Sequence, residues 1–336
     1  MDTICAFSSD SRTLYKADIY RVLALPKGHI VHFRYKKKYV DDNLLQSKAN
    51  LIGKRVAIFF TTGNSNGNTP SQLTNTSIRW GTISHYEISN ETDVFHAYLK
   101  LGEFCNVAID SGNSVEKRPP TKFFSQLACT ESGEESNWQS RISKVKSFFP
   151  NATFLLVKGI YKNDNELPIS YQNSNKSCHY NLINGERYIL KMALGNPDSS
   201  ATKIEVSDSS EEITINCINP IETSVQFDDF DVPISVKTIQ VMKQASLLTF
   251  KPIATKSNNE EKNDFGEYAT NIELSLNLSL KQPALFGFFS MIAAASVFLA
   301  TPVPVTAVRP SICMLIVSAL LFWGSTGTLF YWFNKK

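Results

Sequence analysis

Two long apolar runs constrain this sequence more than any other feature. Residues 284–300 and 312–333 contain no charged side chain. A helix needs about 20 apolar residues to cross the hydrocarbon core of a bilayer, and the first run reaches that length if it continues to residue 303. Because lipid offers the backbone no hydrogen-bond partner, we expect both runs to be helices. Prolines flank the runs, and the short connection predicts a tight transmembrane hairpin over residues 283–336.

Charge at the ends of the hairpin predicts its orientation. Lys335 and Lys336 follow the second run, whereas the connecting loop carries only Arg309. The bias of basic residues towards the cytoplasm therefore favours a cytoplasmic C-terminus, and the N-terminal domains then lie on the same side. The first twenty residues lack the apolar stretch of a signal peptide, which agrees with this topology. We expect an integral protein of a bacterial inner membrane.

Small residues on both runs leave two roles open for the hairpin. They allow close helix packing, either within one hairpin, which then serves as an anchor, or between hairpins of several copies. Neither run carries an ionisable group that would mark a proton or ion relay. The candidate packing residues are Gly287, Ser290, Ala294, Ser318, Gly324 and Gly327.

The first part of the chain, residues 1–109, is typical of a small β-barrel. Five segments rich in β-branched and aromatic residues alternate with turn signals, which favours an SH3-like or OB-like barrel carrying a basic strand. Such modules mostly recognise partners, although the fold alone does not set the function. The five expected strands are residues 18–25, 29–35, 54–62, 79–88 and 94–109.

A connector and a second β domain follow. Residues 110–149 are loop-like and end in a short amphipathic helix, because Trp138, Ile142, Val145 and Phe148 recur at helical spacing. Residues 150–282 return to short strands at the spacing of an immunoglobulin-like β-sandwich, with a charged loop at 255–268. Its expected strands include residues 152–161, 186–194, 202–208, 212–218, 222–236 and 245–252.

The last strand before the apolar runs has an unusually regular pattern. In residues 271–281, NIELSLNLSLK, apolar and polar side chains alternate without a break. This pattern predicts a strand with one buried face and one solvated face. Two interpretations remain: the final strand of the sandwich, or a strand that pairs with a second copy of the chain and so supports a homo-oligomer.

Sequence motifs for catalysis, metal binding or cofactor binding are absent. The six cysteines have no C-x-x-C spacing, the five histidines form no metal-ligand pattern, and no phosphate-binding glycine loop or nucleophile elbow occurs. We therefore expect no cofactor, no metal ion and no enzymatic activity. The net charge of +3 is too small for a dedicated nucleic-acid binder.

A basic segment, HFRYKKKY at residues 32–39, is the candidate binding site. If residues 29–39 form one strand, one face presents a row of basic side chains spaced about 7 Å apart. The row could bind an anionic ligand or lipid head groups, or it could be an ordinary solvated face that discourages edge pairing. The candidate residues are His32, Arg34, Tyr35, Lys36, Lys38 and Tyr39.

The combined pattern predicts a membrane-anchored recognition protein. Its β domains would bind an unidentified protein or anionic ligand, and its hairpin would either anchor them or perturb the bilayer. Bacterial stress and phage-defence effectors share this general layout, which is an analogy of architecture only. The alternative is a membrane-tethered scaffold that docks a protein or nucleic acid.

Overall fold

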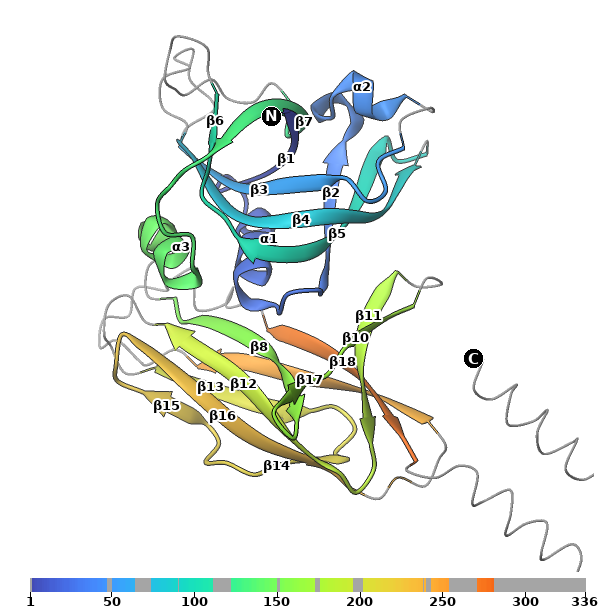
Figure 1. Cartoon of the computed structure of the whole chain (residues 1–336), viewed down its shortest axis with the longest axis vertical. Coiled ribbons are helices and arrows are strands. Elements are labelled where there is room, and N and C mark those ends of the chain that lie inside the picture. Colours follow the sequence, from blue (N-terminus) through green and yellow to red (C-terminus); the bar gives the residue numbers. More distant parts are fainter. Residues whose placement is uncertain are drawn as a thin grey trace, which may run out of the picture. The chain divides into compact units, whose positions relative to one another are not determined.

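The structure is a computed structural model, and most of the N-terminal 280 residues are described in it. The described residues are 2–46, 50–63, 74–89, 91–110, 122–149, 152–172, 176–195, 202–237, 239, 243–253 and 271–280. Residues 1–238 and 244–278 belong to one compact unit, which is mainly β (Figure 1). The second unit, residues 239–243 and 279–336, lies almost entirely outside the described residues.

A seven-stranded sheet forms the first part of the compact unit. Its order is β2-β5-β4-β3-β1-β7-β6, and β1 pairs with β3 in parallel whereas the other pairs are antiparallel. The central strands are buried on both faces, as the run Val56–Thr62 shows. The strands are β1 (Asp2–Ser9), β2 (Ile30–Lys36), β3 (Arg55–Thr62), β4 (Thr74–Ser89), β5 (Val94–Phe104), β6 (Val107–Ile109) and β7 (Phe124–Glu131).

The prediction of a closed barrel is wrong for this sheet. Among the described residues, β2 and β6 lie at opposite ends of an open sheet. One expected strand, residues 18–25, is instead part of helix α1 (Thr13–Ala24). Its buried residues Ile19, Tyr20, Val22 and Leu23 follow helical spacing rather than strict alternation, so they line one helix face. Strand β1 was not among the expected strands, and it pairs with β3 and β7.

The described residues of the predicted connector, 122–149, contain a strand and a helix. Helix α3 (Trp138–Val145) forms where expected, and Trp138, Ile142 and Val145 are buried. The Asn137 side chain caps it by accepting a hydrogen bond from the Ser140 backbone N–H at 2.8 Å. However, β7 also falls within residues 110–149 and completes the first sheet. The other short helices among the described residues are α2 (Asp42–Leu45), η1 (Lys37–Tyr39) and η3 (Lys146–Phe148).

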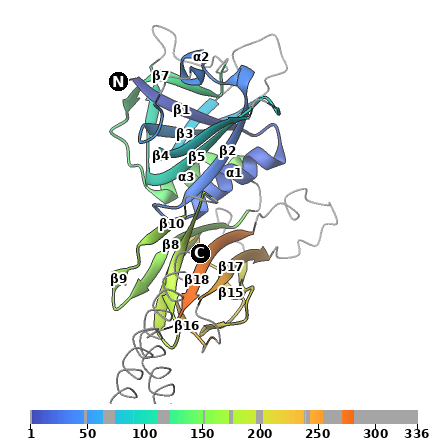
Figure 2. The same cartoon turned by 90° about the vertical axis from the view of Figure 1, so that its right-hand side faces the viewer.

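Two further sheets form the second part of the compact unit, and Figures 1 and 2 show them lying one against the other. The six-stranded sheet has the order β10 (Ile169–Gln172), β11 (Ser177–Ile183), β18 (Ile272–Ser279), β17 (Lys243–Ile253), β13 (Thr202–Asp208) and β15 (Ile221–Thr223). The five-stranded sheet has the order β14 (Ile213–Ile215), β16 (Phe227–Val236), β12 (Arg187–Gly195), β8 (Phe154–Lys162) and β9 (Asn165–Glu166).

The alternating segment at residues 271–281 forms β18, as predicted. Ile272, Leu274, Leu276 and Leu278 are all buried, and the side chains between them are exposed or half-buried. The strand lies between β11 and β17, so both of its edges have neighbours within the chain. This position favours the interpretation of β18 as a core strand of the second part.

The predicted transmembrane hairpin lies outside the described residues, and so do its packing residues Gly287, Ser290, Ala294, Ser318, Gly324 and Gly327. Within the part of the chain that is described, no helix is long and apolar enough to cross a membrane.

Candidate functional site

A groove beside β2 brings together side chains from three elements. Its volume is about 590 Å³, and helix α1, strand β2 and the start of β18 form its walls. All of these residues belong to the same compact unit. The lining residues are Asp18, Arg21, Leu25, His29, Ile30, Val31, His32, Phe33, Arg34, Asn271, Ile272 and Glu273.

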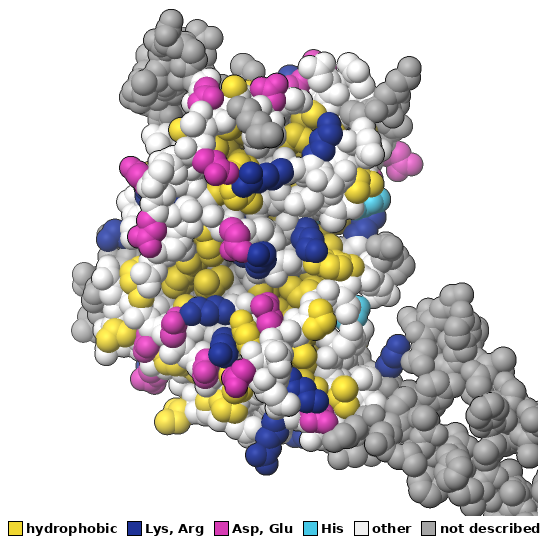
Figure 3. Space-filling view, in the orientation of Figure 1, with side chains coloured by type: hydrophobic (Ala, Val, Ile, Leu, Met, Phe, Trp, Pro, Cys, Tyr) yellow, Lys and Arg dark blue, Asp and Glu magenta, His cyan; other side chains and the backbone are white. Residues whose placement is uncertain are grey.

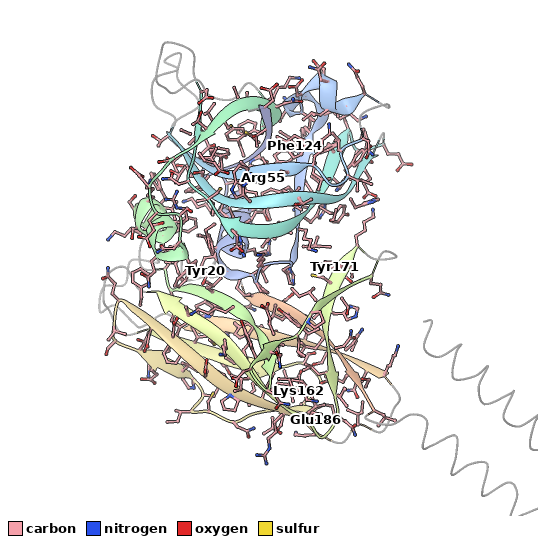
Figure 4. All side chains as sticks on the ribbon, viewed as in Figure 1. Tyr20, Arg55, Phe124, Lys162, Tyr171 and Glu186 are labelled. Carbon is pink, nitrogen blue, oxygen red and sulfur yellow. The ribbon has the colours of Figure 1, made fainter. Side chains whose placement is uncertain are left out.

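Helix α1 is held in place by a buried arginine. The guanidinium of Arg79, on β4, donates hydrogen bonds to the carbonyl oxygens of Val22 and Leu25 at 3.1 and 2.7 Å. These carbonyls belong to the C-terminal end of the helix, where the negative end of the helix dipole favours a cation. Earlier in α1, the ring of Tyr20 packs against Phe154 on β8 (Figure 4). The helix that carries Asp18 and Arg21 is therefore fixed relative to β2.

The turn before β2 is fixed as well. Gly28 has a φ of +87°, a backbone conformation that residues other than glycine rarely adopt. The hydroxyl of Tyr171, on β10, donates a hydrogen bond to the carbonyl oxygen of Gly28 at 2.6 Å (Figure 4). The ammonium group of Lys100 lies 4.6 Å from the centre of the Tyr171 ring. These contacts hold the first residues of β2 against the second part of the unit.

Asp18 is the most perturbed carboxyl group in the groove. Burial raises the pKa of Asp18 to about 6, although the nearby cations Arg21 and Arg34 partly oppose this shift. An oxygen of Asp18 lies 3.2 Å from Nη1 of Arg21, one helical turn away. Arg21 is therefore already engaged by a carboxylate of its own helix.

Arg34 is the cation of the groove that remains available. Its side chain is exposed, and within the described residues no hydrogen bond or ion pair joins it to another group. A guanidinium group has five N–H donors in a planar fork that suits carboxylate and phosphate groups. The arrangement can therefore accept an anionic group without first breaking an ion pair.

His32 contributes stacking and hydrogen bonding rather than charge. Its ring stacks on Tyr98 with centroids 4.4 Å apart, and its Nε2 lies 2.9 Å from Nδ1 of His96. Burial, together with the neighbouring His96 and Arg34, lowers the pKa of His32 to about 4. Burial also lowers the pKa of His29 to about 4. Both imidazoles are thus neutral at pH 7, and neither adds positive charge to the groove.

The predicted row of basic residues is shorter than the sequence suggested. His32, Arg34 and Lys36 share the exposed face of β2, as expected, but the strand ends at Lys36. Lys38 and Tyr39 lie in η1, because the chain turns there, and the Lys38 ammonium group sits 4.8 Å above the Tyr39 ring.

Tyr35 does not belong to the site. It is only 7% exposed, and its hydroxyl donates a hydrogen bond to the carbonyl oxygen of Phe7 at 3.2 Å. Alternation along β2 places its side chain on the core face, opposite to Arg34.

Four polar lining residues of the groove were not foreseen: the charged Asp18, Arg21 and Glu273, and the neutral Asn271. Asp18 and Arg21 fall in the segment misread as a strand, and Asn271 and Glu273 are more than 200 positions away in the chain. The helical spacing of Ile19, Tyr20, Val22 and Leu23 was the one signal that could have revealed α1.

Charge is mixed over the rest of the surface. On the face drawn in Figure 3, basic and acidic side chains are interspersed rather than gathered into a patch of one sign. Within the described residues, no group of three or more His, Cys, Asp or Glu is arranged to hold a metal ion. The groove beside β2 is therefore the site whose chemistry is best defined.

Comparisons with known proteins assign no family. No family and no curated protein matches the chain. Solved structures that align with parts of it include a GH5 xyloglucanase from Bacteroides ovatus, at 11% identity and a TM-score of 0.17 over 34% of this chain and 19% of the other. SSP-19, an MSP-domain protein like family member from Caenorhabditis elegans, aligns at 13% identity and a TM-score of 0.19 over 29% and 92%. Trypsin-activated alpha-2-macroglobulin from Escherichia coli aligns at 8% identity and a TM-score of 0.23 over 64% and 11%.

Proposed function

We propose that this chain is a membrane-anchored, non-enzymatic recognition protein that binds an anionic partner in the groove beside β2. The two later sheets form an immunoglobulin-like sandwich that carries one wall of the groove. The apolar runs at residues 284–300 and 312–333 anchor the protein in a bacterial inner membrane, with both chain ends in the cytoplasm.

The observation that carries this proposal is the unpaired guanidinium of Arg34. It faces a groove of about 590 Å³, which is within the usual range for ligand sites. The carboxylates of Asp18 and Glu273 also line the groove, so it suits a ligand with one anionic group near Arg34 better than a polyphosphate chain.

The expected non-enzymatic role is consistent with the chemistry of the groove. His29 and His32 both have pKa values near 4, too low for a general base matched to neutral pH. Asp18 has a pKa near 6, but its oxygen is engaged by Arg21, and the lining offers no serine, threonine or cysteine nucleophile.

A charge-reversal pair tests the proposal. The full chain in detergent is titrated with labelled poly-L-glutamate, inorganic phosphate, ATP, a single-stranded oligonucleotide and phosphatidylserine vesicles. Arg34→Glu should weaken binding of the preferred anion at least tenfold, whereas Lys38→Glu, an equal charge change outside the groove, should leave it unchanged. Equal loss in both variants, or in neither, would contradict a site at Arg34.

The membrane assignment has its own test. Membranes from cells that express the full chain are washed with alkaline carbonate, and in a separate sample intact spheroplasts are treated with protease from the periplasmic side. The chain should stay in the membrane fraction, and the β domains should survive the protease. Release into the wash would refute the anchor.

The role of the hairpin is tested by dye leakage. A membrane-perturbing effector should release dye from vesicles when the ligand or assembly activates it, whereas a scaffold should leave the vesicles intact.

A further inference from the structure

The backbone of β2, in addition to its side chains, faces the groove. β2 is the terminal strand of its sheet, and among the described residues it pairs only with β5. A terminal strand keeps one row of N–H and C=O groups free, which is a template for another strand. Which residues supply that row follows from the hydrogen bonds at the two ends of β2.

The odd-numbered residues of β2 face β5. The carbonyl oxygen of His29 accepts a hydrogen bond from the Leu101 N–H at 2.8 Å, and the Lys37 N–H donates to the carbonyl oxygen of Asp93 at 3.0 Å. The Ile30 N–H instead points away from β5 and donates to Sγ of Cys178 at 3.4 Å. In an antiparallel strand, the N–H and C=O groups of successive residues point to opposite edges. His32, Arg34 and Lys36 therefore direct these groups away from β5.

The groove follows this outward edge. Residues 30–34 of β2 line it on one side, and Asn271, Ile272 and Glu273 line it on another. Cys178 closes the end of the edge at Ile30, whereas the part from His32 onwards has no partner strand among the described residues. The remaining part of the edge, residues 32–36, is five residues of extended chain, or about 17 Å, and residues 32–34 of it line the groove.

Charge selects the kind of strand. Among the described residues Arg34 makes no ion pair and Lys36 is exposed beside it, while His32 is neutral at pH 7 and the carboxylates of Asp18 and Glu273 line other walls of the groove. A second copy of β2 paired with the first would place these cations against their own kind, which is destabilising. A segment that carries Asp or Glu opposite Arg34 would gain a charge-assisted hydrogen bond.

We propose that an extended, acidic segment of a partner protein binds in the groove by adding as a strand to the open edge of β2. Main-chain hydrogen bonds from His32, Arg34 and Lys36 supply affinity, and the Arg34 guanidinium selects an acidic side chain. This inference rests on the proposed function and names the class of the anionic partner.

N-methylated peptides test the backbone contribution on the unmodified full chain. The probe is a fluorescein-labelled heptapeptide, TIEVDIT, titrated against the protein in detergent by fluorescence anisotropy. Two analogues are N-methylated at alternate residues. One carries the methyl groups at the odd positions of the peptide, and the other carries them at the even positions. One analogue should lose affinity at least tenfold and the other should retain it, because only one register of N–H groups faces β2. Equal binding of both analogues, or no binding of the parent peptide, would overturn the proposal.

A matched pair of variants gives a second test. His32→Ala removes the imidazole but keeps the outward N–H, whereas His32→Pro also removes that donor without removing a bond to β5. His32→Pro should bind the parent peptide at least tenfold more weakly than His32→Ala. Equal affinities would overturn strand addition, and if His32→Pro does not fold, the analogues decide.

The outcomes separate the two proposals. If Arg34→Glu weakens the binding of anions but both analogues bind alike, the anionic groove stands and strand addition falls. If Arg34→Glu has no effect on any anion, the proposed function itself falls. If the protein forms concentration-dependent dimers that the peptide dissociates, a second copy of the chain is the occupant and the acidic partner is excluded.

Discussion

Strands β2 and β18 have similar alternating patterns, but β2 lies at the end of its sheet and β18 lies inside its sheet. In each, apolar side chains face a core: Val31, Phe33 and Tyr35 in β2, and Ile272, Leu274, Leu276 and Leu278 in β18. β18 has neighbours on both edges, whereas β2 pairs only with β5 among the described residues. The polar face of β18 carries mostly neutral residues, and that of β2 carries Arg34 and Lys36. Alternation therefore predicts which face is buried, but not whether an edge is open for binding.

The largest expected difference between the two strands is in stability. Leu276→Ala should lower the free energy of unfolding by about 2–5 kcal/mol, because it leaves a cavity in a buried layer. Denaturant unfolding of the full chain in detergent, followed by tryptophan fluorescence, measures the change. Leu280→Ala, on the half-buried residue just after β18, is the control and should cost much less. A small effect at Leu276 would show that β18 is not a core strand.

The half-buried carboxyl group of Asp18 gives the next effect. Its folded-state pKa of about 6 lies above the ordinary value of 3.8, so burial favours the protonated form. The resulting stability is fully present below about pH 4 and is lost as the pH rises to about 6. Asp18→Asn should abolish this loss, which we expect to be on the order of 2 kcal/mol. The measurement is the free energy of unfolding from pH 4 to pH 7, and an unchanged pH profile in the variant would contradict a raised pKa of Asp18.

The sequence pattern predicted β18 and α3 correctly. The pattern of residues 271–281 was long enough to predict β18 and its buried face, because each side chain reports independently on the same period of two. The helix α3 was predicted for the same reason, from three turns of apolar spacing.

The failures have a physical cause as well. Residues 18–25 contain adjacent apolar pairs, and such a short run is compatible with either a helix or a strand. Once this segment is a helix, the expected barrel loses a strand and the sheet stays open. The groove depends on Asp18 and Glu273 meeting β2, and no local pattern in a sequence reports contacts between such distant positions.

Arg34 gives a smaller effect, and one on binding rather than on stability. Arg34→Ala should weaken binding of the TIEVDIT peptide about tenfold, equivalent to about 1.4 kcal/mol, because it removes the unpaired cation of the groove. The same substitution should change the free energy of unfolding by less than about 0.5 kcal/mol, since the side chain is exposed. Lys38→Ala, measured in the same anisotropy assay, should leave both quantities unchanged. A large loss of stability on removing Arg34 would make its role structural.

The smallest effect concerns His32. Its folded-state pKa of about 4 lies below the ordinary value of 6.5, so folding favours the neutral ring, and the associated stability is lost as the pH falls from about 6.5 to about 4. Because the ring is partly exposed, solvent screens the effect. The melting temperature should fall between pH 6.5 and pH 4, and it should fall slightly less in His32→Gln than in the unmodified chain. A larger decrease in the variant would show that the ring is protonated in the folded state.

Residue-resolved hydrogen exchange of the full chain, with and without the TIEVDIT peptide, tests the open edge of β2 most directly. In the free protein, the amide protons of His32 and Arg34 should exchange much faster than those of Val31 and Phe33, which face β5. The peptide should slow exchange at His32 and Arg34 and leave Val31 and Phe33 unchanged. Equal protection of all four amides in the free chain, or no change on addition of peptide, would contradict the account.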